Sequence, residues 1–143
     1  MAIKSLYIIG SLRDPGRTSV QKVSAAIREL GIEAFDDWLS PGPEADDHWR
    51  EYERAKGRTY AEALQGYAAQ HVFEFDKHHI DRTDGAVLVL PCGKSGHLEL
   101  GYVLGKGKPG FILLDDPERW DVMYQFATGI FDSTDKLLEV LRQ

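Results

Sequence analysis

The chain has 143 residues with 43% hydrophobic content, which predicts one domain spanning residues 1–143 with a sizeable core. The absence of a long apolar run excludes a membrane-spanning helix, and the single cysteine excludes an internal disulfide and favours a reducing, cytoplasmic compartment. The formal net charge of −6 argues against duplex nucleic acid as a partner, because binding along a phosphate backbone needs a broad basic face.

The first predicted elements are two strands joined by an amphipathic helix. Residues 5–10 (SLYIIG) form an apolar run typical of a buried strand, and residues 32–38 form a second run that ends at Trp38. Between them, apolar residues recur three and four positions apart, which predicts a helix that Thr18 or Ser19 can cap.

A longer excursion follows the second strand. Residues 40–46 have the composition of an exposed loop and lead into a polar segment over residues 47–56. Thr59 can then cap a long helix, because apolar residues recur three and four positions apart as far as Ile80. This helix is predicted to carry Asp76 near its last turns.

The most informative stretch is a strand, a glycine-rich loop and a helix within residues 84–109. Residues 86–90 (AVLVL) are uniformly apolar, as in a strand covered on both faces of a parallel sheet. Pro91 ends this run, and helical spacing resumes after residues 92–96, with Glu99 near the predicted start of the helix. The residues expected to approach the sheet are Leu98, Tyr102 and Leu104, with Gly101 and Gly105 permitting close contact.

Four segments after this stretch complete the pattern. We expect a strand over residues 111–114, a short helix over 118–126, a last strand over 129–132 and a capped helix over 133–141. Alternating strands and helices predict an α/β fold: a parallel, flavodoxin-like (Rossmann-like) sheet of about five strands with helices on both faces. The excursion is then a helical insertion after the second strand.

Three polar residues are candidates for chemistry: Tyr7 in the first strand, Asp76, and Glu99 at the helix start. Ligands of open α/β sheets bind at the carboxyl ends of the strands, so Glu99 is expected at the ligand edge. Each residue also has a structural explanation. A carboxylate in a first helical turn is stabilised by the helix dipole by about 0.3 to 1 kcal/mol, and a strand tyrosine is often a core residue.

Two loops at predicted helix starts can bind an anion such as a 5′-phosphate. The first offers Gly10, Ser11 and Arg13, and the second offers Gly93, Ser95 and Gly96 beside a lysine. The alternative is a pair of ordinary loops with solvated basic residues. A nucleophile made of Cys92 and His97 is a weaker possibility, and no residue pattern indicates a metal site.

The motifs in their order resemble the nucleoside 2-deoxyribosyltransferase family and the related 2′-deoxynucleoside 5′-monophosphate N-hydrolases. The resemblance rests on residues 6–13 (LYIIGSLR), on Asp76 followed eight positions later by Asp84, and on residues 96–102 (GHLELGY) with the Gly-Lys-Pro turn at 107–109. The loop at residues 92–97 departs from the small, glycine-rich segment that is usual in the family.

The resemblance implies an enzyme that cleaves an N-glycosidic bond without a cofactor. Glu99 is then the nucleophile that forms a glycosyl ester, Asp76 assists proton transfer at the departing base, and Tyr7 hydrogen-bonds the nucleophile. Water or a second nucleobase accepts the sugar of a nucleoside or (deoxy)nucleoside 5′-monophosphate. The insertion is expected to cover this site and to supply a side chain such as Trp38.

The resemblance also implies a homodimer or a larger homo-oligomer. The segment 118–126 contains four aromatic or apolar residues that can pack against a neighbouring copy or lie in the core: Trp120, Met123, Tyr124 and Phe126. Two other functions remain open. One is an NAD- or nucleotide-sugar-cleaving hydrolase, and the other is a nucleotide-binding or sensing module without turnover.

Overall fold

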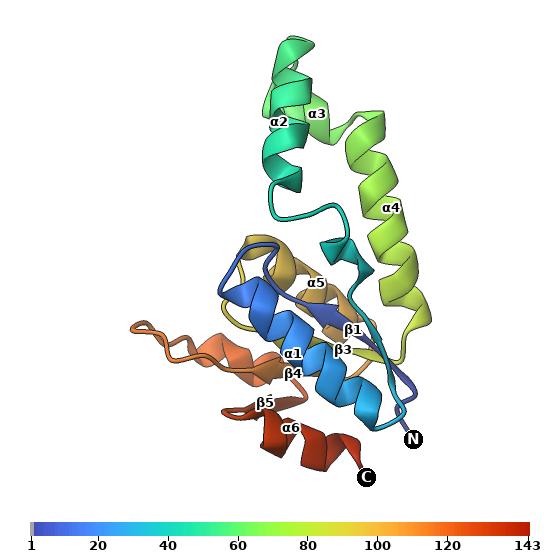
Figure 1. The fold of residues 1–143 in the computed structure, drawn as a ribbon, viewed down its shortest axis with the longest axis vertical. Coiled ribbons are helices and arrows are strands. Elements are labelled where there is room, and N and C mark those ends of the chain that lie inside the picture. Colours follow the sequence, from blue (N-terminus) through green and yellow to red (C-terminus); the bar gives the residue numbers. More distant parts are fainter. Residues whose placement is uncertain (1) are drawn as a thin grey trace.

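Five parallel strands form one sheet in the computed structural model, which describes residues 2–143 (Figure 1). The strand order is β2-β1-β3-β4-β5, so the chain builds one edge first and then crosses the centre to build the other. Helices cover both faces, which confirms the predicted flavodoxin-like α/β class. The strands are β1 (Ser5–Ile9), β2 (Glu33–Phe35), β3 (Gly85–Val89), β4 (Gly110–Leu113) and β5 (Gly129–Phe131).

Side chains of the central strands alternate between two hydrophobic clusters on opposite faces of the sheet. The covering helices are α1 (Gly16–Glu29) and α6 (Thr134–Leu141) on one face, and α4 (Tyr67–Arg82) and α5 (Lys94–Gly105) on the other. In β1, Leu6 and Ile8 pack towards α1 and α6, whereas Tyr7 and Ile9 pack towards α4 and α5. Tyr7 therefore points to the face covered by the two helices that carry the candidate carboxylates.

Strand β2 ends at Phe35, three residues before the predicted end, and Trp38 lies in a short 3-10 helix, η1 (Asp37–Leu39). β2 is an edge strand that pairs only with β1. Beyond this pairing, the indole N–H of Trp38 donates to the carbonyl oxygen of Ile8 at 2.7 Å. The predicted second strand is too long, because beyond Phe35 the chain bonds to β1 through the Trp38 side chain and not through backbone amides.

Helix α1 begins at Gly16, ahead of the predicted cap at Thr18 or Ser19. Asp14 supplies the polar group instead, because its Oδ1 accepts hydrogen bonds from the Thr18 backbone N–H at 2.9 Å and from the Thr18 hydroxyl at 2.5 Å. These two bonds hold the pKa of Asp14 below its usual value. The predicted helix is correct, but the residue that satisfies its first turn comes from the loop before it.

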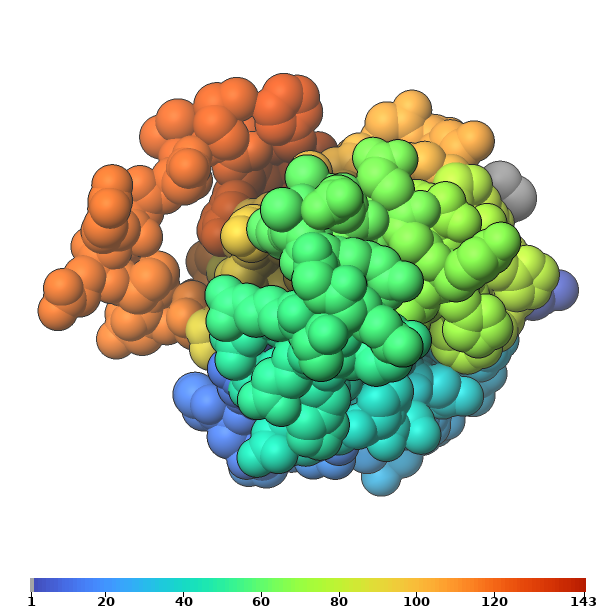
Figure 2. Space-filling model, turned by 90° about the horizontal axis from the view of Figure 1, so that it is seen from above, coloured from blue at the N-terminus to red at the C-terminus, as the bar shows by residue number. Residues whose placement is uncertain are grey.

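The insertion consists of α2 (Ala45–Ala55), α3 (Tyr60–Leu64) and the first half of α4, which together extend beyond the sheet (Figure 1; Figure 2 shows them from above). Thr59 caps α3 as predicted, in a capping box with Glu62 whose two hydrogen bonds measure 3.0 and 3.1 Å. The predicted long helix nevertheless divides at Gly66, where ψ is 173°. The apolar spacing continues across this break, so the pattern could not reveal it.

The chain after β4 forms an arm before it returns to β5 (Figure 1). The predicted helix over residues 118–126 is reduced to a 3-10 helix, η2 (Val122–Phe126), whose start is capped by Asp121. Helix α6 is capped by Ser133 as predicted. No helix within residues 2–143 has both the length and the apolar character needed to cross a membrane.

Helix α5 approaches the sheet through Gly96, Leu100 and Val103, which lie on one face of the helix. The prediction for Leu98 is wrong, because its side chain is 75% exposed, while Tyr102 and Leu104 are partly buried against the sheet. Gly101 and Gly105 are also wrong as close-contact positions, because a Cβ at either residue would meet no atom within 4 Å. The close approach is at Gly96, where a Cβ would lie 2.2 Å from Cys92 Sγ and 2.9 Å from Ile9 Cγ2.

Two alanine substitutions in α5 are expected to have opposite effects on stability. Gly96→Ala lowers the free energy of unfolding by about 1 to 3 kcal/mol, because the added methyl group overpacks the helix–sheet contact. Gly101→Ala raises it by about 0.5 to 1 kcal/mol, because the helix gains rigidity and nothing is displaced. Urea denaturation of both variants measures the difference, and a change of the same sign in both would contradict this account of the contact.

Candidate active site

The structure brings Tyr7, Asp76 and Glu99 together at the carboxyl end of the sheet, on the face covered by α4 and α5. The Tyr7 hydroxyl donates a hydrogen bond of 3.2 Å to Glu99 Oε2, and the Tyr7 side chain is only 1% exposed. Glu99 lies in the second turn of α5, and Asp76 lies in the second half of α4. Both carboxylates are half-buried. We refer to these three residues as the Tyr7–Asp76–Glu99 cluster.

Burial raises the pKa of all three groups in the cluster, and the negative charge of a neighbouring carboxylate adds to this effect at Glu99 and Tyr7. Burial and the negative charge of Asp76 raise the pKa of Glu99 to about 7, although the hydrogen bond from Tyr7 acts in the opposite direction. Burial raises the pKa of Asp76 to about 6. Burial and both carboxylates raise the pKa of Tyr7, so its hydroxyl remains a donor. Near neutral pH the two carboxyl groups therefore titrate as a coupled pair.

A structural role explains this pair poorly. No acidic residue occupies the first turn of α5, so Glu99 lies beyond the part of the helix where the dipole acts strongly. Within residues 2–143, neither carboxylate forms an ion pair with a lysine, an arginine or a histidine. Two adjacent half-buried carboxyl groups without a cation destabilise the fold. Because both pKa values are raised, the pair holds one proton near neutral pH, so one group can act as a nucleophile while the other acts as an acid.

The two candidate anion-binding loops lie side by side. Gly16, at the end of the first loop, is so close to the second that a Cβ there would lie 2.9 Å from the carbonyl oxygen of Pro91. Gly10 begins the first loop in a similarly tight position, where a Cβ would lie 2.2 Å from Val20 Cγ2. In the second loop, Gly93 is the N-cap of α5 and Ser95 is exposed in its first turn.

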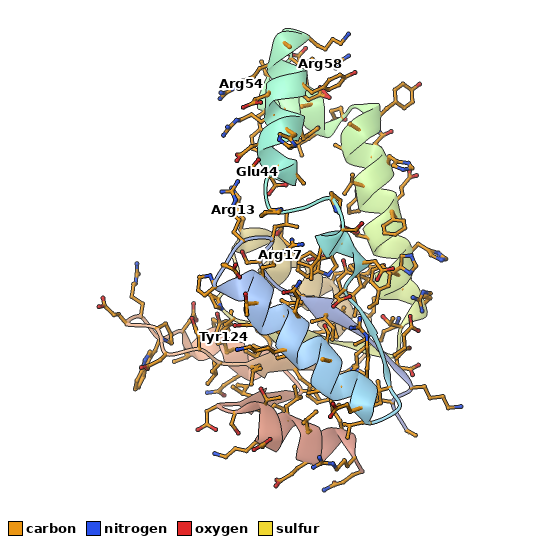
Figure 3. All side chains as sticks on the ribbon, in the orientation of Figure 1. Arg13, Arg17, Glu44, Arg54, Arg58 and Tyr124 are labelled. Carbon is orange, nitrogen blue, oxygen red and sulfur yellow. The ribbon has the colours of Figure 1, made fainter. Side chains whose placement is uncertain are left out.

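Arg13 contacts the insertion rather than the open edge of the sheet. Its Nε donates to the carbonyl oxygen of Pro43 at 3.0 Å, and its terminal nitrogen lies 2.7 Å from Asp47 Oδ2. The side chain extends from the first loop towards the base of α2 (Figure 3). Ser11 faces the same loop, because its hydroxyl accepts from the Arg13 backbone N–H at 3.2 Å. Arg13 thus holds the insertion to the loop that precedes α1.

Sequence reasoning missed the contact between His97 and Tyr124. His97 Nδ1 lies 2.8 Å from the carbonyl oxygen of Gly93, and Nε2 lies 2.9 Å from the Tyr124 hydroxyl. A carbonyl oxygen can only accept, so Nδ1 carries the proton and, in the neutral ring, Nε2 accepts from Tyr124. Both nitrogens are therefore occupied, and burial and Glu99 raise the pKa of the Cys92 thiol. The arrangement argues against a nucleophile made of Cys92 and His97.

Three further observations delimit the site. A cavity of about 670 Å³ lies between α1, η1 and α4, lined by residues that include Arg17, Arg28 and Phe75 but not Glu99. Asp84 lies at the amino end of β3, where its carboxylate accepts from the Lys4 and Ser5 backbone N–H groups. Among residues 2–143, no three histidine, cysteine or acidic side chains converge so as to hold a metal ion.

Comparison with protein-family models and with curated protein sequences gives no match. Among solved structures, the chain is similar to a 2-deoxyribosyltransferase from Bacillus psychrosaccharolyticus, characterised as a biocatalyst for the synthesis of antiviral and antitumoral nucleosides. The TM-score is 0.62, with 18% sequence identity over 93% of this chain and 89% of that chain. At this identity the similarity concerns the backbone, and it shows that the chain shares its α/β fold with a 2-deoxyribosyltransferase.

Proposed function

We propose that the protein is an enzyme that cleaves the N-glycosidic bond of a nucleoside or a (deoxy)nucleoside 5′-monophosphate. The observation that carries the proposal is the Tyr7–Asp76–Glu99 cluster, a half-buried pair of carboxyl groups without a cation at the ligand edge of the sheet. The fold that the chain shares with a 2-deoxyribosyltransferase supports the same assignment.

The proposed reaction proceeds in two displacements. The carboxylate of Glu99 attacks the anomeric carbon, the C–N bond breaks with its electron pair passing to the base, and protonated Asp76 gives its proton to the departing base. Tyr7 holds Oε2 of Glu99, which leaves the other oxygen to form the glycosyl ester. Water or a second nucleobase then attacks the same carbon and gives its proton to the ionised Asp76, while the ester bond breaks to restore the Glu99 carboxylate. Two inversions retain the configuration of the sugar.

The adjacent loops are proposed to bind the 5′ side of the substrate. Backbone N–H groups at the start of α5 and the Ser95 hydroxyl are hydrogen-bond donors, and they bind a negatively charged phosphate more strongly than an uncharged hydroxyl group. Arg13 can contribute only if the substrate competes with Asp47 for its guanidinium group. Trp38 can contribute only its ring, because its indole N–H already bonds to Ile8.

The experiment that tests this function is incubation with a panel of nucleosides and 5′-monophosphates, with and without a second nucleobase, followed by chromatography of the products. Free base shows cleavage, and an exchanged base shows transfer. The ratio of the cleavage rates for 5′-monophosphates and for free nucleosides tests the role of the loops. Release of nicotinamide from NAD would instead favour the nucleotide-cleaving alternative. Tight binding of an intact nucleotide without base release over hours would contradict catalysis.

We also propose that the chain forms a homodimer or a larger homo-oligomer. The arm around η2 exposes large apolar side chains, with Trp120 90% exposed and Phe126 73% exposed, which excludes the core as their location. Solution scattering is expected to give at least twice the chain mass of 16.1 kDa. The double variant Trp120→Ser and Phe126→Ser is expected to shift the protein to a monomer, whereas Val140→Ser on α6 leaves the mass unchanged. A monomeric wild-type protein would overturn the proposal.

A further inference from the structure

Few contacts hold the helix that carries Asp76. Of the residues of α4, only Ile80 is buried, and Tyr67 at its start is 92% exposed. The first half of the helix extends beyond the sheet with the rest of the insertion (Figure 1). The position of Asp76, one turn before Ile80, therefore depends on how the last turns of α4 are attached.

One attachment fixes the end of the helix. Lys108 Nζ, from the turn before β4, donates to the carbonyl oxygens of Ile80 at 3.3 Å and Thr83 at 2.8 Å. The Tyr102 hydroxyl, on α5, donates to Asp81 Oδ1 at 2.6 Å. These contacts act at or beyond the last turn. They hold the end of the helix but leave its tilt to a second point of contact.

The second point of contact is a column of stacked rings that begins in the Tyr7–Asp76–Glu99 cluster. The His79 ring lies on Phe35 with a centroid distance of 3.9 Å and an interplanar angle of 13°. Phe35, buried in β2, stacks on Tyr7 at 5.5 Å and 27°. Because Asp76 and His79 are three residues apart, they share one side of α4. The column thus starts at the ring of Tyr7, whose hydroxyl bonds Glu99, and ends at the ring of His79, one turn from Asp76.

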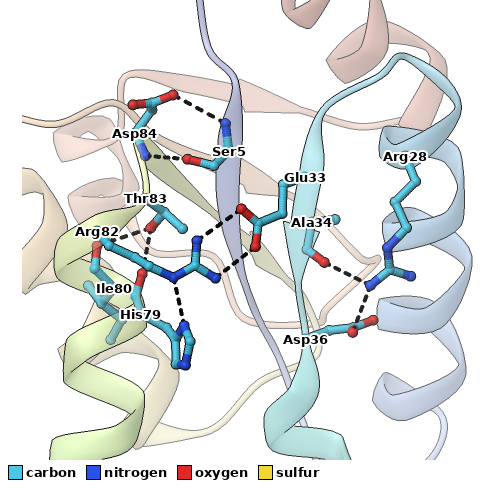
Figure 4. A network of polar contacts seen from close by, with 10 residues as sticks. All are labelled: Ser5, Arg28, Glu33, Ala34, Asp36, His79, Ile80, Arg82, Thr83 and Asp84. Carbon is cyan, nitrogen blue, oxygen red and sulfur yellow. Dashed lines mark hydrogen bonds and ion pairs between the residues drawn. The ribbon is translucent and has the colours of Figure 1, made fainter.

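Arg82 keeps the His79 ring in place. Its Nε donates to His79 Nδ1 at 2.8 Å, and its two terminal nitrogens donate to the two Glu33 oxygens at 2.9 and 2.7 Å (Figure 4). The bidentate pair fixes the guanidinium group against the edge of the sheet. His79 Nδ1 accepts, so the ring is neutral; burial, Arg82 and His78 lower its pKa, whereas Asp37 and Glu33 act in the opposite direction.

We propose that His79 is a positioning residue, which through its stack on Phe35 and its hydrogen bond from Arg82 sets the separation between Asp76 and Glu99. Its consequence for catalysis rests on the proposed function, whereas the placement of Asp76 does not. Without the ring, α4 tilts outward about its fixed end, and water reaches the Asp76 carboxyl group. With the ring, both carboxyl groups are located by one rigid stack.

The direct test is the titration of Asp76 by carboxyl ¹³C NMR without substrate. In His79→Leu the pKa of Asp76 is expected to fall from about 6 towards its ordinary value of 3.8, by about one unit or more, because the group becomes hydrated. His79→Phe retains the stack and is expected to show a smaller fall. His71→Leu, which alters an exposed ring about two turns earlier on α4, is expected to leave the titration unchanged.

Kinetics on the best substrate of the panel supply the second readout. His79→Leu is expected to lower kcat by about 10- to 100-fold with little change in KM, because the acid is displaced from the departing base. Unchanged Asp76 titration in both His79 variants would overturn the proposal. A shifted titration in a protein without glycosidic activity would instead refute the proposed function alone. If His79→Leu fails to fold, Arg82→Met removes the hydrogen bond that supports the ring and replaces it in the comparison, with His79→Phe as the variant that keeps the stack.

Discussion

Glu99→Gln is expected to lower kcat by about 10³-fold or more without disturbing the fold. An amide of nearly the same shape can still accept the hydrogen bond from Tyr7, but it cannot form the glycosyl ester. Glu139→Gln, an exposed carboxylate on α6, is the matched control and should retain full activity. Single-turnover assays on the panel substrate measure both variants, and retained turnover in Glu99→Gln would remove the nucleophile from the mechanism.

The same variant is expected to be more stable than the wild type at alkaline pH. The pKa of Glu99 is raised to about 7 in the folded chain, so folding favours the protonated form and ionisation destabilises the native state. The penalty is absent below about pH 4, where the group is protonated in both states. It develops as the pH rises from the ordinary pKa of 4.5 to the folded value of about 7, and it is complete above that. Calorimetry should therefore show a gain of about 1 to 3 kcal/mol at pH 8 and almost none at pH 4. A gain independent of pH would contradict this explanation.

Asp76→Asn is expected to reduce the rate of base release by about 10² to 10⁴-fold and to change the pH profile of what remains. In the wild type, the coupled carboxyl groups predict a bell-shaped kcat/KM profile with its maximum between about pH 6 and 7. Removing the Asp76 charge lowers the pKa of Glu99, so the acidic limb moves to lower pH. The alkaline limb disappears because no acid remains to lose its proton.

The control for this prediction is Glu74→Gln, which removes an exposed charge from the same helix two residues away. Its profile should match the wild type, because a solvated carboxylate is screened from Glu99. Substrates whose base leaves readily without protonation should lose less activity in Asp76→Asn than substrates with a poor leaving group. An acidic limb that stays in place in Asp76→Asn would show that the two carboxyl groups are not coupled.

Local sequence patterns predicted which helices and strands form, but they did not predict the boundaries and buried faces that depend on contacts with other elements. The apolar run at residues 86–90 and the helix cap at Thr59 depend on neighbours in the chain, and both predictions are confirmed within one residue. The break at Gly66 and the early end of β2 were not predicted, because both leave the apolar spacing intact. Leu98 illustrates the same limit, since one face of α5 was inferred without knowing which face the sheet covers.

The candidate site divides in a similar way. The amino-acid sequence was enough to identify the groups available for chemistry, with Tyr7, Asp76 and Glu99 selected by motif order and resemblance. The tertiary fold was needed to bring Tyr7 to Glu99 across 92 positions of the chain and to pair Asp47 with Arg13. It also stacked His79 on Phe35, from separate elements of the chain. Such contacts join side chains far apart in sequence, and periodicity carries no information about them because it reports only which face of its own element a residue occupies.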